Sequence, residues 1–438
     1  MGTRSALATA CAKYHYMRLQ WQQKQIYYGW AIVGALAMTE TISWGVLYYA
    51  FAVFLVPIQS ELGWSQVAVT GAFSLALALS GIAALPVGRW LDRRGARLLM
   101  TAGSCIATLL VLAWASVTQL AAFYAIWAGI GLCMATLLYE PAFAVVTKWF
   151  ARQRSRALAI VTFVAGFAST IFAPLSAWLI GAYGWRAALV ILAIVLGVGT
   201  IPLHALVLRR RPQDLGLAPD GGVDLTGQAV CTPTERSTSL HTALRGRSFW
   251  WLTTAFMLTN LAAIATTVHL VAYLTTRGHT AGFAATATGL IGAMKLPGRL
   301  LFAPLDARFS RRTITTTLFG LQGLALLVLL FAPTVAGVLL FVALFGGATG
   351  ATTLARPALL AEFYGPMHYA SISGVLALAL ASAQALAPVS AGALRAALGG
   401  YEPVFGLLAL ISLCAAGAIF LAEAARKRTI HDYDRQIV

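Results

Sequence analysis

The sequence has few charged residues for its length. Asp, Glu, Lys and Arg together make up 10% of its 438 residues, whereas hydrophobic residues make up 59%. Soluble domains carry about 25% charged residues, so this composition excludes a soluble enzyme built around a large core. The mean hydropathy of +0.78 instead predicts an integral membrane protein.

Cysteine is also scarce. Cys105, Cys133 and Cys414 lie in apolar runs, and Cys11 and Cys231 lie in polar segments where we expect no oxidising environment. No cysteine and histidine spacing resembles a metal site, and no Gly-x-x-x-x-Gly-Lys-Ser/Thr loop for nucleotide phosphates is present. We therefore expect no disulfide, no metal, no cofactor and no nucleotide, and no catalytic residues.

Long apolar runs dominate what is present. A run of about 20 apolar residues suffices to cross a bilayer. Such runs lie near residues 29–57, 67–87, 98–117, 121–147, 157–180 and 187–208, and again near 249–274, 283–305, 313–331, 335–360, 371–394 and 403–421. The pattern predicts an all-α membrane protein with twelve transmembrane helices.

Basic residues sort to alternate turns between these runs. The turns after the second, fourth and eighth runs hold Arg89, Arg93, Arg94 and Arg97, then Lys148, Arg152, Arg154 and Arg156, then Arg308, Arg311 and Arg312. The opposite turns hold only Arg186, Arg277 and Arg395. By the positive-inside rule both termini are cytoplasmic. This bias accounts for most of the net charge of +17, so we expect anionic lipid as a partner and no nucleic acid.

The polar segments divide the chain into parts. We expect a cytoplasmic tail at 1–28, which lacks the features of a cleaved signal, six-helix units at 29–208 and 248–422, a cytoplasmic linker at 209–247 and a tail at 423–438.

The two halves repeat each other. Gly88-Arg89-Trp90-Leu91-Asp92-Arg93-Arg94-Gly95-Ala96-Arg97 follows the second run, and a weaker copy, 303–312, follows the eighth. A shift of 216 residues places Glu140-Pro141-Ala142 on Arg356-Pro357-Ala358. This is the pattern of a duplicated six-helix unit with an axis along the membrane normal.

With these features the sequence resembles the major facilitator superfamily. Its signature of Gly, Asp, a basic residue, Gly and a second basic residue matches Gly88, Asp92, Arg93, Gly95 and Arg97. The resemblance implies two pseudo-symmetric six-helix bundles and secondary active transport. Asp92 would accept hydrogen bonds from a helix N-terminus, or pair with an arginine, in one conformation and release them in the other. A solvated loop without a switching role is the alternative.

The second copy of this turn departs from the signature. Ala303, Ala307 and Ser310 stand where the family has Gly, Asp and Gly. We therefore expect the first copy to carry more of the switching role.

The eighth run carries Lys295 and Arg299 one helical turn apart. The residues after Arg299 resemble the monocarboxylate and oxalate transporter branch of this superfamily, in which an arginine here binds the substrate carboxylate. A guanidinium matches a carboxylate with two hydrogen bonds. The alternatives are that Lys295 extends to the interface and that Arg299 caps a helix end.

Glu140 and Arg356 are charges inside apolar runs, which are costly in lipid and mark functional sites. Glu140 either takes and releases a proton during transport, with Arg356 as its partner or as a substrate ligand, or forms a structural ion pair with it. Weaker candidates are Glu40 for proton coupling, and Tyr139, His269 and Asn260 for substrate binding.

We therefore expect a monomeric, multi-pass protein of a bacterial inner membrane that takes up a small mono- or dicarboxylate with protons. One alternative is a proton-driven exporter of amphiphilic or cationic compounds that uses Glu40 and Glu140. A membrane enzyme or a non-transporting sensor is the alternative from another class.

Overall fold

The described part of the chain is built from helices. The computed structural model describes residues 27–221 and 237–437, and within these ranges there is no strand. Cys11, Cys231 and all but two residues of the expected tail at 1–28 lie outside the described residues. The prediction of an all-α membrane fold is confirmed.

The N-terminal half contains six spans. The first is made of α2 (Tyr28–Trp44), the π-helix η1 (Gly45–Tyr49) and α3 (Ala50–Leu62). The others are α4 (Gln66–Arg94), α5 (Ala96–Ala115), α6 (Leu120–Leu137) with α7 (Tyr139–Trp149), and α8 (Arg154–Ala165) leading into α9 (Ala168–Pro202) and the π-helix η2 (Leu203–Val207).

The C-terminal half follows two short 3-10 helices, η3 (Pro212–Leu215) and η4 (Pro219–Gly221), and the short helix α10 (Leu240–Arg245). Its helices are α11 (Arg247–Thr276), α12 (Ala281–Asp306), α13 (Arg311–Phe331), α14 (Val335–Tyr364), α15 (Tyr369–Leu398) and α16 (Tyr401–Ile437). Helix α16 continues past residue 422, through the segment that we expected to be a tail.

Ten helical stretches in the described ranges are long and apolar enough to cross a membrane. The stretch Arg154–Val207 contains two crossings, because Gly184 has a non-helical, positive φ of 79° and reverses the chain. Helix α12 is 26 residues long but carries Lys295, Arg299 and Asp306, which make it less apolar. With α12 included, the arrangement agrees with six helices in each half.

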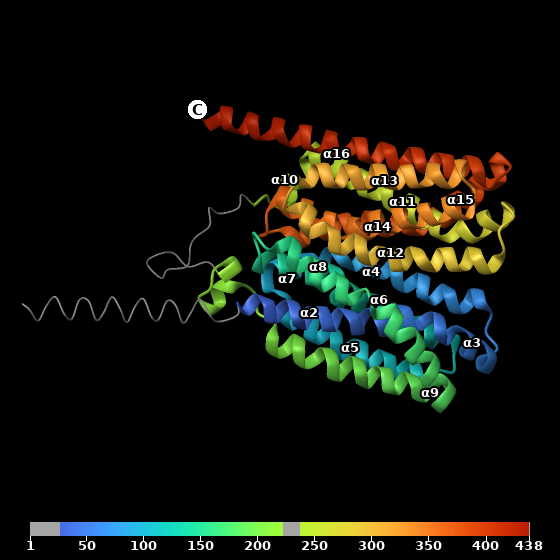
Figure 1. The fold of residues 1–438 in the computed structure, drawn as a ribbon. Coiled ribbons are helices and arrows are strands. Elements are labelled where there is room, and N and C mark those ends of the chain that lie inside the picture. The colour runs from blue at the N-terminus through green and yellow to red at the C-terminus, as the bar shows by residue number, and fades with distance from the viewer. Residues whose placement is uncertain (1–26, 222–236, 438) are drawn as a thin grey trace, which may run out of the picture.

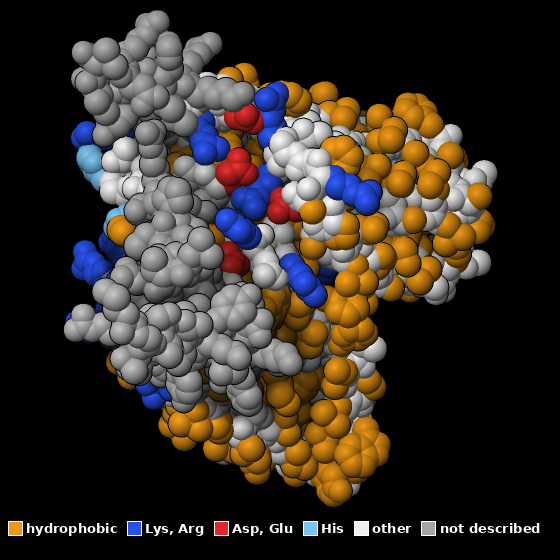
Figure 2. Space-filling view, turned by 60° about the vertical axis from the view of Figure 1, so that its left-hand side comes forward, with side chains coloured by type: hydrophobic (Ala, Val, Ile, Leu, Met, Phe, Trp, Pro, Cys, Tyr) orange, Lys and Arg blue, Asp and Glu red, His pale blue; other side chains and the backbone are white. Residues whose placement is uncertain are grey.

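The helices run side by side, and one end of the bundle holds η3, η4, α10 and the C-terminal end of α16 (Figure 1). We call this end the linker side and the opposite end the far side. Figure 2 brings the linker side forward and shows Lys, Arg, Asp and Glu side chains gathered there, with hydrophobic side chains along the flanks. This distribution suits a bundle whose flanks face lipid.

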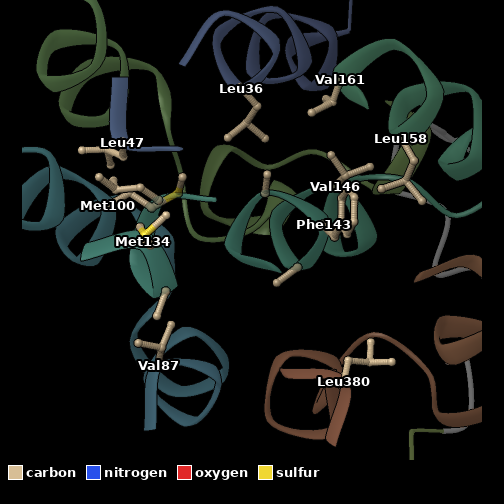
Figure 3. Close-up of a cluster of buried hydrophobic side chains, with 14 of the residues drawn as sticks. Leu36, Leu47, Val87, Met100, Met134, Phe143, Val146, Leu158, Val161 and Leu380 are labelled. Carbon is tan, nitrogen blue, oxygen red and sulfur yellow. The ribbon is translucent and has the colours of Figure 1, made fainter. Parts of the chain in front are cut away.

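Buried apolar side chains hold each half together. Figure 3 shows Leu36, Met100, Met134 and Phe143 converging from α2, α5, α6 and α7. Between the halves, α4 packs on α15 and α8 packs on α12 and α14. Helix α7 also packs on α15, so the two halves meet along α4, α7, α8, α12, α14 and α15.

The fourth span breaks where the sequence places Glu140. Leu138 is extended, with φ −86° and ψ −168°, and a new helix starts at Tyr139. Pro141 is tolerated there because the first turn of a helix has no intrahelical partner for its missing N–H. Pro357, its counterpart, lies inside the uninterrupted helix α14. The break places the Glu140 carboxylate in the first turn of α7, near the positive end of that helix.

Candidate functional site

A cavity of about 790 Å³ lies between the two halves. Helices of both halves line it, including η1, α7, α11, α12, α14 and α15. This volume is within the range of pockets that hold small organic molecules. The cavity is therefore the candidate substrate site.

The charged residues among the described residues that line the cavity are mostly basic. Glu140 is the one acid, and Lys295, Arg299 and Arg356 are the bases. The N-terminal half supplies the acid, whereas the C-terminal half supplies all three bases. A cavity with this excess of positive charge favours an anionic ligand.

Glu140 bridges the two halves. One carboxylate oxygen accepts a hydrogen bond from Arg356 Nη2 in an ion pair, and the other accepts one from the hydroxyl of Ser373. The side chains of Arg356 and Glu140 are 17% and 25% exposed, so the pair is partly open to the cavity. Removing one member would leave a poorly solvated charge, which is more costly than losing a surface ion pair.

Arg299 also reaches across to the other half. Its Nη1 donates to the backbone carbonyl of Thr162 on α8 at 2.6 Å, while its Nε is buried without an acceptor. Gly166, just after α8, makes this approach possible, since a Cβ there would lie 2.7 Å from Arg299 Nη1. No carboxylate in the described part of the chain pairs with Arg299.

The Lys295 side chain has neither a hydrogen bond nor an ion pair within residues 27–221 and 237–437. It lies one turn before Arg299 on α12 and lines the same cavity. Its backbone lies against Gly350 of α14, where a Cβ would be 2.6 Å from the Lys295 Cα. The close packing of α12 on α14 holds both cations at the cavity wall.

The N-terminal half contributes a group of aromatic side chains to the cavity. Trp44, Tyr48, Tyr49 and Tyr139 all line it. Ring centroids are 5.0 Å apart for Trp44 and Tyr139, 5.1 Å for Trp44 and Tyr48, and 5.2 Å for Tyr48 and Tyr49. Of these four residues, the sequence singled out only Tyr139.

Neutral polar groups complete the cavity wall. Asn260 lines it and donates from Nδ2 to the Leu380 carbonyl at 3.3 Å. Further hydroxyl and amide groups come from Thr349, Thr352, Thr353 and Gln384. The three threonines carry no signal in the sequence, because threonine is common in apolar helices, where its hydroxyl bonds the preceding turn.

Two of the expected site residues lie off the cavity wall. Glu40 is fully buried, accepts a hydrogen bond from Trp44 Nε1 at 3.1 Å and has its other oxygen unpartnered. His269 contacts the Pro388 carbonyl through Nε2 at 3.1 Å and the Tyr401 hydroxyl through Nδ1 at 3.5 Å. Neither is among the residues that line the cavity.

On the linker side, Asp92 at the end of α4 receives the N-terminus of α15. Its carboxylate accepts hydrogen bonds from the backbone N–H groups of Ala370 at 3.2 Å and Ser371 at 2.8 Å. Lys148 Nζ lies 3.6 Å from the same carboxylate. Gly88, one turn earlier, leaves no room for a Cβ against the Ala370 carbonyl.

The rest of the signature turn shapes the end of α4. Gly95 has a φ of 81°, which a residue with a Cβ rarely adopts. Arg97 Nε donates to the Ala205 carbonyl at 2.7 Å, and the Arg93 carbonyl accepts from Arg210. Arg93 and Arg97 thus fasten the turn within the N-terminal half, and Asp92 crosses to the other half.

The weaker second copy of this turn also makes a contact between the halves. Asp306, at the end of α12, accepts a hydrogen bond from the Ser155 hydroxyl on α8 and pairs with Arg311 at 2.9 Å. The signature does not point to this acid, because Asp306 stands one residue before Ala307, the counterpart of Asp92.

All of these contacts between the halves lie at the cavity or on its linker side. Asp92 joins the end of α4 to α15, and Asp306 joins the end of α12 to α8. Glu140 joins α7 to both α14 and α15. The halves are therefore joined on the linker side in this conformation.

Comparison with known proteins agrees with the fold. The family model described as Major Facilitator Superfamily matches residues 33–335 and 278–435. Monocarboxylate transporter 13 of Bos taurus is 27% identical over 401 residues, which cover 90% of this chain and 88% of that protein. The chain thus resembles monocarboxylate transporters along nearly its whole length.

Solved structures show the same fold. FucP in the outward conformation, a transporter of the same superfamily, matches with a TM-score of 0.68 and 16% identity over 90% of this chain and 98% of that chain. The human organic anion transporter MFSD10 matches with a TM-score of 0.68 and 15% identity over 89% and 99%. This chain belongs to the Major Facilitator Superfamily, and it is a multi-pass membrane transporter of a small molecule, not an enzyme.

Proposed function

We propose that this member of the Major Facilitator Superfamily takes up a small organic anion, a mono- or dicarboxylate, together with protons. The observation that carries the proposal is the charge of the cavity. The cavity is lined by three bases, Lys295, Arg299 and Arg356, and by one acid among the described residues, Glu140. Only Arg356 pairs with that acid, so Lys295 and Arg299 have no acidic partner in the described residues. The resemblance to a monocarboxylate transporter supports the same substrate class.

Arg299 is proposed as the main ligand of the substrate carboxylate. Its guanidinium is fixed at one nitrogen by the Thr162 carbonyl, and its planar set of donors matches the two oxygens of a carboxylate. Lys295, one turn away and without a partner, adds a second positive charge. Tyr139 and Asn260 supply neutral hydrogen bonds from the cavity wall.

Glu140 is proposed as the group that couples protons to transport. As a carboxylate it holds Arg356 and Ser373 of the other half. A protonated Glu140 would lose the ionic part of this bridge, so that the halves could separate on the linker side. Glu40, which is buried and accepts a hydrogen bond from Trp44, is the second candidate for this role.

The transport cycle would be alternating access. The six-helix units at 29–208 and 248–422 would rock about the cavity, and the Asp92 and Asp306 contacts would form and break once in each cycle. By the positive-inside rule we assign the linker side and both termini to the cytoplasm of a bacterial inner membrane. The conformation described here then faces the outside, and a monomer would suffice for the cycle.

The exporter of cationic compounds is the competing assignment. It would use Glu40 and Glu140 as acids that face the ligand. However, Glu140 is occupied by Arg356, and Glu40 does not line the cavity. The excess of bases in the cavity would repel a cation, so this assignment has less support.

The proposal is tested by uptake into sealed proteoliposomes under an imposed pH gradient. We expect carboxylate uptake to rise when the outside is acidic, and Glu140→Gln to remove most of this dependence because the residue no longer titrates. Glu402→Gln, which changes an acid that lies outside the cavity and pairs with Arg277, is the matched control. Unchanged pH dependence in Glu140→Gln would transfer the coupling role to another residue, with Glu40 next. Uptake of lipophilic cations without carboxylates would overturn the proposal.

A further inference from the structure

We infer that the transported carboxylate carries an aromatic ring. This inference rests on the proposed function and narrows its substrate class. It comes from the aromatic group of the N-terminal half, Trp44, Tyr48, Tyr49 and Tyr139, which lies on the same cavity as the cations of the C-terminal half.

The rings of this group remain partly open to the cavity. Trp44, Tyr48 and Tyr139 are half-buried, and the Tyr49 residue is 36% exposed. Other aromatic residues of the same half, such as Phe51 and Trp127, are buried in the core. Packing within the protein explains those buried rings, but it leaves unexplained why four aromatic residues converge on a cavity. Apolar surface of this kind gains about 25 cal/mol for each Å² that a ligand covers.

The aromatic group is held in place from behind. Trp44 Nε1 donates to the buried Glu40 carboxylate at 3.1 Å, which fixes the indole. The Tyr48 ring packs on Phe73, with ring centroids 5.3 Å apart. The Tyr139 ring stacks on Phe143 at 5.2 Å with an interplanar angle of 6°. Rings fixed in this way lose little conformational freedom when a ligand binds.

The anchoring cation lies next to these rings. Arg299, Tyr49 and Tyr139 all line the same cavity. A carboxylate bound at Arg299 therefore lies beside the aromatic group, and the rest of the ligand can contact Trp44 and Tyr49. Aromatic rings pair in offset or edge-to-face arrangements when their centroids are 4.5–7 Å apart.

The size of the cavity supports a ligand with a ring. A two- or three-carbon acid bound at Arg299 would fill a small part of about 790 Å³. The remaining wall would stay in contact with water, including the four aromatic side chains. A carboxylate that carries a ring satisfies the cation and covers the aromatic surface in one molecule, and the hydroxyl and amide groups of α14 and α15 remain for its further polar substituents.

The test measures how strongly four acids of equal charge, and one cation, compete with carboxylate uptake into proteoliposomes. The acids are phenylacetate, cyclohexylacetate, lactate and acetate, and the cation is phenethylammonium. We expect phenylacetate to compete roughly tenfold better than cyclohexylacetate, because the face and edge of its ring add aromatic pairing to simple burial. Lactate and acetate should compete more weakly still.

Two variants test whether the aromatic group causes the preference for phenylacetate over cyclohexylacetate. Trp44→Leu should reduce the preference for phenylacetate over cyclohexylacetate towards one, and Tyr49→Leu should act in the same direction if Trp44→Leu fails to fold. The matched control is Trp178→Leu, which removes a tryptophan that is 61% exposed on α9 and does not line the cavity. This control should keep the preference of the parent protein.

The outcomes separate this inference from the proposed function. Equal competition by phenylacetate and cyclohexylacetate, or stronger competition by lactate, would overturn the aromatic inference and leave carboxylate transport standing. A preference that survives in both Trp44→Leu and Tyr49→Leu would also overturn it. Competition by phenethylammonium alone would overturn both, since a cation would then be the substrate.

Discussion

At the scale of single residues, the three cationic side chains of the cavity differ in their bonding partners. Arg356 is neutralised by Glu140, Arg299 is held by one backbone carbonyl, and Lys295 has no partner in the described ranges. A substrate carboxylate would have to displace Glu140 to reach Arg356, whereas Arg299 and Lys295 need lose no anionic partner. This difference supports the proposal that α12 provides the main contacts to the substrate.

Replacing Arg299 by lysine keeps the charge and removes the planar set of donors. We expect Arg299→Lys to raise the KM for carboxylate uptake by about tenfold or more, since one hydrogen bond to a charged group contributes ~1.5–3 kcal/mol. Initial rates in proteoliposomes measure this change. Arg395→Lys, at an arginine that lies over the Tyr401 ring outside the cavity, should leave the KM unaltered. A normal KM in Arg299→Lys would exclude recognition through two hydrogen bonds.

Some of these residues could be predicted from the sequence, and some could not. Glu140 and Arg356 stood out because charge is rare in apolar runs and because the repeat aligns them. Ser373, which also holds Glu140, gave no signal because a serine in an apolar helix is ordinary. His269 was singled out by the same rarity, but its ring nitrogens contact Pro388 and Tyr401, off the cavity wall.

At the scale of helices, the contact between α4 and α15 depends on small residues. Gly374 of α15 faces the backbone of α4, and a Cβ on it would lie 2.5 Å from the Ala84 carbonyl oxygen. Gly88 of α4 faces Ala370 in the same way, one helical turn before Asp92. The small side chains let the two helices come close enough for Asp92 to reach the N-terminus of α15.

We expect Gly374→Ala to weaken this conformation by about 1–3 kcal/mol, the usual cost of overpacking a close contact. The change would appear as a lower thermal midpoint of the purified protein and as faster labelling of a cysteine introduced at Ala84. Gly320→Ala is the matched control, because a Cβ there meets nothing within 4 Å and the substitution removes only a helical glycine. Equal midpoints for the two variants would show that the contact does not limit stability.

The helices themselves were predicted well because twelve apolar runs leave few alternatives for a chain in lipid. The contact of α12 with the other half was not predicted, since Asp306 stands one residue before the counterpart of Asp92 under the shift of 215 residues that aligns these two turns. Its partner, Ser155, is the counterpart of Ser371 under the shift of 216 residues. Two helix ends can occupy equivalent places in the two halves of the fold. If one residue has been inserted or deleted between them, an alignment of the two halves no longer matches their residues.

At the scale of the whole molecule, the cycle requires the halves to separate on the linker side. Gly81 of α4 and Ala381 of α15 offer a place to prevent this, because a Cβ on Gly81 would lie 2.5 Å from the Ala381 Cβ. A disulfide needs its two Cβ atoms about 3.5–4.5 Å apart, so a small outward shift of either helix would allow the bond.

Oxidation of the double variant Gly81→Cys, Ala381→Cys, in a background without other cysteines, should reduce uptake to the level of empty liposomes. Reduction should restore it, since the two halves are then free to move again. Each single variant under the same oxidant is the control. Full uptake by the cross-linked protein would rule out rocking of the halves about the cavity.

The π-helix η1 has a consequence for how the first span tolerates change. A π-helical turn contains one more residue than an α-helical turn, and such a segment often occurs at functional sites. In this span η1 begins directly after Trp44 and ends at Tyr49. Losing one residue from Gly45–Tyr49 would restore a regular helix and leave α3 nearly unrotated relative to α2, because the wider π-turn takes up the extra residue. Because this segment also carries Tyr48 and Tyr49 on the cavity wall, such a loss should alter the cavity while it keeps the packing of α3.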